Sequence, residues 1–331
     1  MGQIATLLGD TRPALSDGAI GTMLQAAGLM PGASPEIWNV ERADAMRVIH
    51  TAYADAGAQL LTTNTFGGTR PRLALHGFED RVHELNEAGA RIARDVADAC
   101  GALVLGSIGP TGDLMEPLGL LSHDAAADLF AEQAGGLAAG GAHILLFETF
   151  SDLGEVRAGV EGARRAAPDL PVAVTMTFDL KGHTMMGVSP SQALAEISAL
   201  GVELIGGNCG SGPDEIEAVM VTMTAERPDG VLLLAQSNAG LPQLVGDEFR
   251  YGGTPEVMAD YAVRMQELGV DVIGSCCGST PSHTAAMREA LPLIARRMPN
   301  PRYSGEPVVR PVSGLTGPVE LPIAFDREGE G

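Results

Sequence analysis

Residues 202–227 read VELIGGNCGSGPDEIEAVMVTMTAER, and this stretch shows the unit from which the whole chain is built. The apolar run at 202–210 ends in the polar pair Asn208 and Cys209, and the segment 213–227 has apolar residues at helical spacing. A run that is apolar on both faces is typical of a parallel strand covered on both sides. We therefore predict a buried strand, a short turn and a helix.

The same alternation of a short apolar run and a longer helical segment continues along the chain. We predict further strands at 14–21, 58–66, 102–109, 143–150, 171–178, 230–238 and 270–278. We predict further helices at 41–57, 79–100, 123–140, 152–166, 190–200, 255–269 and 281–298. These repeated units favour a single (β/α)8 TIM barrel of the α/β class, and an open, doubly wound parallel sheet is the alternative.

The end of the chain differs in composition from the rest. Prolines recur between residues 299 and 322 with glycines among them, and this pattern disfavours regular structure. We predict a barrel domain at 1–298, followed by an extended or disordered tail at 299–331. An extended tail could reach a second copy of the chain, so a homodimer is one possible assembly.

The charge balance excludes several classes of partner. Among the 331 residues, 21 Lys and Arg face 42 Asp and Glu, a formal net charge of −21. Nucleic acid and anionic membranes need a basic face, so we expect neither as a partner. No apolar stretch reaches the roughly 18 residues of a membrane span, and the first residues lack the pattern of a secretory signal. We expect a cytoplasmic protein.

Three of the four cysteines are placed where a barrel builds its active site. Cys209, Cys276 and Cys277 lie at the ends of predicted strands, which converge on one face, whereas Cys100 lies at a helix end and is assigned to packing. Adjacent cysteines rarely form a disulfide with each other. Three thiolates with a free fourth position make a plausible catalytic Zn2+ site. The alternative is that the three thiols are small buried apolar groups.

A zinc site of this kind suits alkyl transfer to a thiol. The free position can bind a substrate thiol and hold it as a nucleophilic thiolate. For an amino-acid thiol, carboxylates must hold the ammonium group and backbone N–H groups the carboxylate. Asp17 and Glu148 are suitable acids, and the turn at 18–22 supplies amides. A salt bridge for Glu148 and a simple Asp-Gly turn for Asp17 are the structural alternatives.

Seven motifs, taken together, carry a resemblance to a known family. They read SDGAIGT, TTNTFGGTR, GSIGPTGDL, FETFSDL, GGNCGSGP, SNAGLP and GSCCGSTPSH, and the match runs from about Leu15 to about Leu291. The chain resembles the homocysteine S-methyltransferase family, which includes betaine–homocysteine methyltransferases and the homocysteine module of cobalamin-dependent methionine synthase. The last motif departs from the usual Gly-Gly-Cys-Cys-Gly-Thr by small-for-small changes.

The resemblance implies roles for individual residues. It places the zinc ligands on Cys209, Cys276 and Cys277. Homocysteine recognition would fall on Asp17, Gly18, Thr22, Asn64, Glu148 and Asn238. The expected function is a zinc-dependent homocysteine S-methyltransferase that forms methionine. The alternatives are methylation of another small thiol and a non-catalytic module that docks a corrinoid protein.

The methyl donor is less defined by the sequence. Betaine enzymes of animal type look to have aromatic residues near the second and fourth strand ends, where this chain has Gly67 and Thr149. Trp38, the only tryptophan, could offer one cage wall. The chain has no Asp-x-His-x-x-Gly cobalamin motif, so a corrinoid would have to arrive on a separate protein. We predict methyl transfer from protein-bound methylcobalamin more readily than from glycine betaine.

Overall fold

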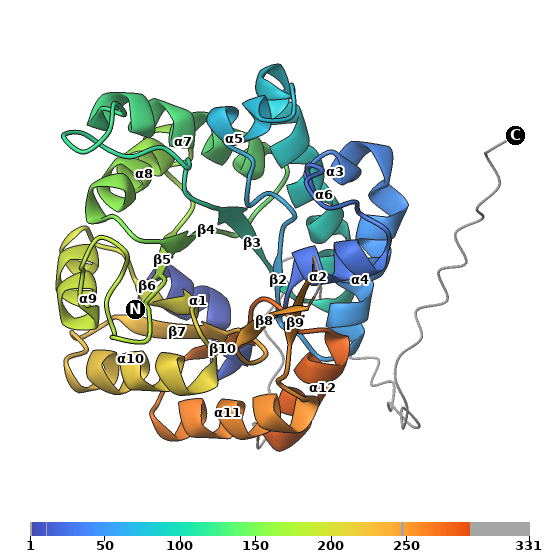
Figure 1. Ribbon diagram of the computed structural model, residues 1–331, viewed down its shortest axis with the longest axis vertical. Coiled ribbons are helices and arrows are strands. Elements are labelled where there is room, and N and C mark those ends of the chain that lie inside the picture. Colours follow the sequence, from blue (N-terminus) through green and yellow to red (C-terminus); the bar gives the residue numbers. More distant parts are fainter. Residues whose placement is uncertain (1, 11, 246–247, 292–331) are drawn as a thin grey trace, which may run out of the picture.

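A computed structural model describes residues 2–10, 12–245 and 248–291. Within these residues, eight parallel strands form one sheet in the order β1-β10-β7-β6-β5-β4-β3-β2 (Figure 1). The strands are β1 Ala14–Leu15, β2 Leu60–Thr62, β3 Leu103–Ile108, β4 Ile144–Phe150, β5 Val172–Met176, β6 Leu204–Cys209, β7 Leu232–Ser237 and β10 Val272–Ser275. A bridge between Ser16 and Leu60 joins β1 to β2 and closes the sheet. The predicted TIM barrel is confirmed.

Helices surround this barrel and follow its strands, as predicted. They are α4 Ala43–Asp55, α6 Val82–Cys100, α7 His123–Ala139, α8 Leu153–Ala166, α9 Pro190–Ala199, α10 Pro213–Ala225, α11 Pro255–Glu267 and α12 Pro281–Ala290. Several begin at capping side chains, such as Ser122, Asp152 and Ser189, each of which accepts a hydrogen bond from a backbone N–H of the first turn. Among the described residues, no helix is long and apolar enough to cross a membrane.

The strands are shorter than predicted at one or both ends. The clearest case is the predicted strand 14–21, of which only Ala14–Leu15 belongs to β1, and a short helix, α2 Ile20–Ala26, follows it. The prediction of a helix at 281–298 is confirmed as far as Ala290. The helix ends there, because Leu291 already has extended backbone geometry. Residues 292–298, the predicted domain boundary at 298 and the tail at 299–331 lie outside the described residues.

The segments predicted as loops contain further short elements. These are α3 Trp38–Glu41, α5 Arg70–Ala74, and an antiparallel pair of strands, β8 Pro242–Val245 and β9 Glu248–Tyr251. The helix predicted at 79–100 begins as a 3-10 helix, η1 Glu79–Arg81, and continues as α6. A further helix, α1 Gln3–Leu8, was not predicted either. Its buried Ile4 and Leu8 join the apolar cluster of the barrel interior, and Glu203 accepts hydrogen bonds from the backbone N–H groups of Gln3 and Ile4.

The barrel interior changes character along its axis. The apolar interior cluster takes Ala14, Leu60, Leu105, Leu146, Ala173, Leu234 and Val272 from seven different strands. Because side chains on a strand alternate between two faces, the residues two positions later point inward as well. Those residues are Ser16, Thr62, Ser107, Glu148, Thr175, Gln236 and Gly274. A polar layer therefore covers the apolar core and forms the floor of the mouth at the carboxyl ends of the strands.

Candidate metal and substrate site

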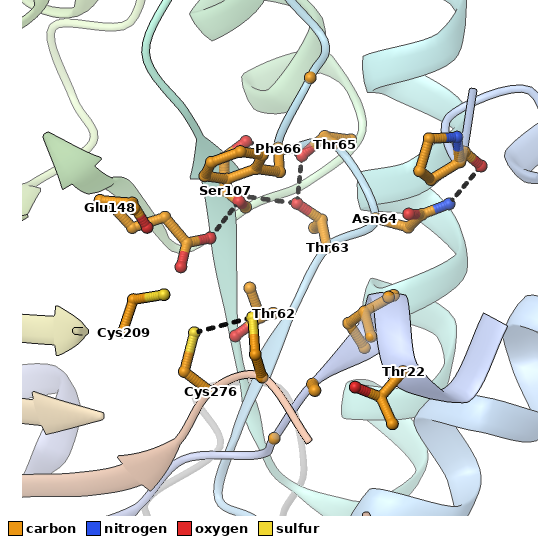
Figure 2. A pocket seen from close by; sticks show the side chains of 18 of the residues that line it. Thr22, Thr62, Thr63, Asn64, Thr65, Phe66, Ser107, Glu148, Cys209 and Cys276 are labelled. Carbon is orange, nitrogen blue, oxygen red and sulfur yellow. Dashed lines mark hydrogen bonds between the residues drawn. The ribbon is translucent and has the colours of Figure 1, made fainter. Parts of the chain in front are cut away.

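A cavity of about 460 Å3 lies above this polar layer. Its lining residues come from the ends of strands across the whole barrel and from the loops that follow them, so residues far apart in sequence share one space (Figure 2). The convergence of strand ends that the sequence predicts is confirmed. A cavity of this size at the carboxyl end of a barrel is a typical small-molecule site.

The three predicted cysteine ligands come together at one side of this cavity. Cys209 is the last residue of β6, and Cys276 and Cys277 follow β10 directly. Their sulfur atoms all lie within 4.8 Å of one another, and the sulfurs of Cys276 and Cys277 are 4.0 Å apart. Tetrahedral ligation with Zn–S bonds of about 2.3 Å requires sulfur atoms roughly 3.8 Å apart. The donor set therefore fits a tetrahedral ion with a free fourth position.

The backbone around the cysteines is shaped to bring the thiols together. Cys209 has a φ of +62°, in the left-handed region that residues other than glycine rarely adopt, and it ends the strand at this point. The Cys276 N–H donates to the carbonyl of Ser237 at 2.7 Å, and the Ser279 hydroxyl donates to the Cys276 carbonyl at 2.7 Å. Gly278, with φ of +81°, completes the turn. We call residues 276–279 the metal loop.

The three thiols lie close enough to shift one another's pKa. Interaction with Cys276 and Cys277 lowers the pKa of Cys209, and interaction with Cys209 raises the pKa of Cys276 and of Cys277. Such interaction is expected of cysteine side chains placed to bind one metal ion, which would displace their protons.

Of the other predicted site residues, Gly18, Thr22, Asn64 and Glu148 line the cavity. Glu148 points inward from β4, and its carboxylate accepts a hydrogen bond from the Ser107 hydroxyl. Burial raises the pKa of Glu148 to about 7. In Figure 2 this carboxylate and the Cys209 thiol lie on the same side of the cavity. Glu148 forms no ion pair with any residue that the structure describes.

The side chains of Thr22 and Asn64 are held by loops of the rim. The Thr22 hydroxyl accepts a hydrogen bond from the N–H of Gly278 at 3.0 Å, which joins the turn at 18–22 to the metal loop. The Asn64 amide donates to the Pro35 carbonyl at 2.7 Å and to the Asn39 side chain at 3.1 Å. Both residues therefore fix the walls of the cavity.

Asp17 and Asn238 lie behind the wall and are not among the residues that line the cavity. The Asp17 carboxylate accepts from the Thr62 N–H at 2.6 Å and from the Thr62 hydroxyl at 2.7 Å, and burial raises its pKa to about 7. Asn238 donates to the Gly210 carbonyl at 2.7 Å. Asp17 thus ties β1 to β2, and Asn238 holds the turn after Cys209.

Two polar residues outside the predicted set support the cysteines. The Asn208 Oδ1 atom accepts from the Thr149 N–H and from the Thr175 hydroxyl, both at 2.8 Å, and its Nδ2 atom lies 4.0 Å from the Cys276 sulfur. Tyr251, at the end of β9, lies beside Cys277, and its hydroxyl acts to lower the pKa of that thiol. Asn208 could be found from its place beside Cys209, but nothing in the sequence pattern singles out Tyr251.

The aromatic residues are arranged differently from the expectation for Trp38. This side chain is buried in α3 with the Arg42 guanidinium 4.8 Å from its ring, and it does not line the cavity. Gly67 and Thr149 do line the cavity, as do Phe66, Arg72 and His76, which the sequence analysis did not single out. Phe66 is 38% exposed, and Figure 2 places it above Ser107.

Comparisons with known proteins agree with this geometry. The sequence profile of the Homocysteine S-methyltransferase family matches residues 14–291. The chain is 36% identical over 315 residues to a methionine synthase of Mycobacterium tuberculosis, covering 90% of this chain and 26% of that protein. A methionine synthase of Mycobacterium leprae is 36% identical over 304 residues, covering 86% and 24%. The chain thus spans about a quarter of the length of these curated relatives.

Among solved structures, the metallated form of the homocysteine methyltransferase MmuM from Escherichia coli superposes with a TM-score of 0.73 at 25% identity, covering 87% of this chain and 99% of that one. Its oxidized form, at 24% identity and the same TM-score of 0.73, shows the shared fold. The profile match covers nearly the whole described barrel. The chain therefore belongs to the homocysteine S-methyltransferase family.

Proposed function

We propose that this chain transfers a methyl group to the thiol of homocysteine and forms methionine, with Zn2+ held by Cys209, Cys276 and Cys277. The observation that carries the proposal is the cluster of three sulfur atoms within 4.8 Å of one another at the wall of the cavity. Membership of the family supports it, as do the names of the relatives, which are methionine synthases and a homocysteine methyltransferase with a metallated form.

The zinc ion would supply Lewis acidity that lowers the pKa of the substrate thiol and keeps the sulfur as a thiolate. The chain itself orients the amino-acid part of the substrate. The Glu148 carboxylate lines the cavity without an ion pair among the described residues, so it is suited to the substrate ammonium group. The amides of the turn at 18–22, which Thr22 fixes to the metal loop, are suited to the substrate carboxylate.

The reaction then needs only a methyl group in line with the sulfur. The thiol proton leaves to solvent, a sulfur–carbon bond forms, and the bond between the methyl carbon and the donor atom breaks. The electron pair of that bond stays on the donor. Thr62, Ser107 and Thr175 of the polar layer each donate a hydrogen bond to a neighbouring side chain. These hydrogen bonds hold the floor of the cavity in place during the reaction.

Two alternatives use the same cavity. Another small thiol could occupy the metal position, and the buried Glu148 then selects those that carry an ammonium group. A module that only docks a corrinoid protein would not need this carboxylate, whose burial in a cavity costs free energy. The geometry therefore favours an enzyme that acts on an amino-acid thiol.

Two donor types remain within the proposal, a separate methylcobalamin-carrying protein and glycine betaine. The loop between β3 and α7 exposes Leu114, Leu118 and Leu120, of which Leu120 is 96% exposed, and such an apolar rim suits contact with a large partner. The Phe66 ring in the cavity suits a small cationic donor instead.

The direct test combines metal analysis with a substrate panel. We expect purified protein to contain zinc and to methylate L-homocysteine faster than cysteine or 2-mercaptoethanol, followed by mass spectrometry of the products. Each thiol is assayed with glycine betaine and with a methylated corrinoid protein. Zinc-loaded protein that binds no homocysteine in calorimetry contradicts the proposal.

A further inference from the structure

An arginine and a histidine line the catalytic cavity on the side of the barrel away from the cysteines. Arg72, on α5, and His76, two residues after this helix ends, are four residues apart, and both line the cavity. Figure 1 shows α5 at the edge of the mouth next to α7, across the barrel from β10. The cavity therefore has a thiolate side and a cationic side.

Arg72 differs from most arginines of the chain in its partners. It forms no ion pair within the described part of the chain, although acids outnumber bases by two to one. Arg70, on the same helix, pairs with Asp80 and with Glu132. An unpaired guanidinium that lines a cavity in so acidic a chain is available to an anion from outside.

The surroundings hold Arg72 in place. A Cβ atom added at Gly112 would lie 3.5 Å from the Arg72 Nη1 atom, so the loop after β3 packs beside the guanidinium. This loop is anchored by Thr111, whose N–H and hydroxyl both donate to buried Glu155, at 2.8 and 2.7 Å. Arg72 thus lies between a short helix and a tethered loop.

We propose that Arg72, with His76 beside it, binds the carboxylate of a small zwitterionic methyl donor. The inference rests on the proposed function, because it assigns the second substrate of the same cavity, and it departs from the sequence-based preference for methylcobalamin because Arg72 and Phe66 line that cavity. The planar guanidinium matches a carboxylate with two parallel hydrogen bonds. The cationic methyl-bearing group of such a donor then lies over Phe66, which also lines the cavity.

The size of the cavity agrees with two small substrates bound together. At about 460 Å3 it falls within the range of single small-molecule sites, and it is too small to enclose a corrinoid as well as homocysteine. The proposed function assigns the carboxylate of homocysteine to the turn at 18–22, which the hydrogen bond between Thr22 and Gly278 holds beside the metal loop. Arg72 is left for the donor.

The transfer balances without a further reactant. For a quaternary ammonium donor, the homocysteine thiolate forms the new sulfur–methyl bond while the nitrogen–methyl bond breaks. The electron pair remains on nitrogen, which becomes a neutral tertiary amine. The donor carboxylate is unchanged and stays on Arg72 until the product leaves.

Binding of unreactive analogues tests the subsite without turnover. The acid 3,3-dimethylbutyrate has the shape and carboxylate of glycine betaine, and 3,3-dimethylbutanol has the same apolar group without the charge. In calorimetry with zinc-loaded protein, we expect the acid to bind about 10- to 100-fold more tightly than the alcohol. Arg72→Leu should remove this difference, and Arg72→Lys should restore part of it. Arg47→Leu, at a surface arginine paired with Asp95, should leave it unchanged.

The opposite results are equally clear. Equal binding of acid and alcohol by the unmodified protein overturns the proposal, even if an Arg72 variant fails to fold. An Arg72→Leu protein that still binds the acid more tightly than the alcohol also overturns the proposal. Tighter binding of inorganic phosphate than of the acid overturns it as well. An Arg72→Leu protein with a raised KM for homocysteine and an unchanged KM for glycine betaine assigns Arg72 to homocysteine instead.

Failure of homocysteine to bind refutes the proposed function, whereas the acid and alcohol titrations without homocysteine still test Arg72.

Discussion

The ring of Tyr251 lies directly against Gly278, so close that a Cβ atom added at Gly278 would sit 2.2 Å from the Tyr251 Cγ atom. This contact places the end of the β8–β9 pair on the metal loop, where the Tyr251 hydroxyl meets Cys277. The adjoining Gly253 carbonyl accepts from the His283 ring at 3.0 Å, and the Gly253 N–H donates to the Ala239 carbonyl at 2.8 Å. The loop after β7 therefore supports the cysteines of β10.

Removing the Tyr251 hydroxyl should weaken metal binding without unfolding the barrel. A hydrogen bond to a ligating sulfur orients that ligand, and losing such a partner typically costs about 10- to 100-fold in metal affinity. We expect Tyr251→Phe to show this loss in competition with a zinc chelator, and an unchanged Tm for the metal-free protein. Equal zinc affinity of the two proteins would show that the hydroxyl does not support the ligand.

The cysteines themselves should differ sharply from the fourth thiol of the chain. Cys209→Ala and Cys276→Ala should each lose both zinc and methyl transfer, because two sulfurs no longer complete the site. Cys100→Ala is the matched control, since this thiol is exposed at the end of α6. Metal content by mass spectrometry decides the matter, and full zinc content in the Cys209→Ala protein would refute the three-cysteine site.

Replacing Glu148 should weaken binding of homocysteine and leave binding of zinc unchanged. If its carboxylate pairs with the homocysteine ammonium group, Glu148→Gln should raise the KM for homocysteine by about 10- to 150-fold, the effect of losing one charged hydrogen bond. Zinc content should stay at the level of the unmodified protein. A variant with normal zinc and an unchanged KM would remove Glu148 from the substrate site.

His50 should make the stability of the fold depend on pH. Its side chain is fully buried in α4, neither ring nitrogen has a hydrogen-bond partner among the described residues, and burial lowers its pKa to about 4. The unfolded chain, with an ordinary histidine pKa near 6.5, therefore takes up a proton more readily than the folded chain. The stability that His50 contributes is complete above pH 6.5 and is lost as the pH falls through about 4, a loss of roughly 3 kcal/mol.

The comparison with His50→Leu isolates this effect, because Asp17 and Glu148 have raised pKa values and act in the opposite direction. In urea unfolding at pH 7.5, the variant should equal or exceed the unmodified protein in stability, since no unpaired ring nitrogen is buried. At pH 4.5 its advantage should be larger. A stability difference between the two proteins that does not change with pH would contradict the assignment.

The sequence predicted the barrel and the location of the site for the same reason. Strand ends in a barrel meet at one face, so Cys209, Cys276 and Glu148 could be grouped although they lie on three different strands. The closure of the sheet depends on β1, which the sequence predicted at 14–21 and which has only two residues, and the bridge from Ser16 to Leu60 could not be read from either segment alone.

The residues that the sequence did not identify lie outside the eight barrel strands. Phe66 and Arg72 line the cavity from the segment after β2, and Tyr251 reaches Gly278 from the end of β9, positions that no periodic pattern records. Asp17 has the expected residue type at the expected strand end, yet its carboxylate is taken up by Thr62, a partner 45 residues away. The sequence pattern thus predicted a carboxylate at this strand end, but it could not predict that Thr62 would be the hydrogen-bond partner of Asp17.

The pairing of β1 with β10 also sets an order of events during synthesis. Arg12 and Asp271, 259 residues apart, form an ion pair at 3.2 Å where the two strands meet. β1 is therefore synthesised long before β10, and the edge of β1 that pairs with β10 has no partner strand until then. The metal loop follows β10 directly, so Cys209 waits as well. If the proposed function holds, binding of zinc by all three cysteines would therefore be one of the last steps in the maturation of the barrel, because Cys276 and Cys277 are made only after the last strand of the sheet.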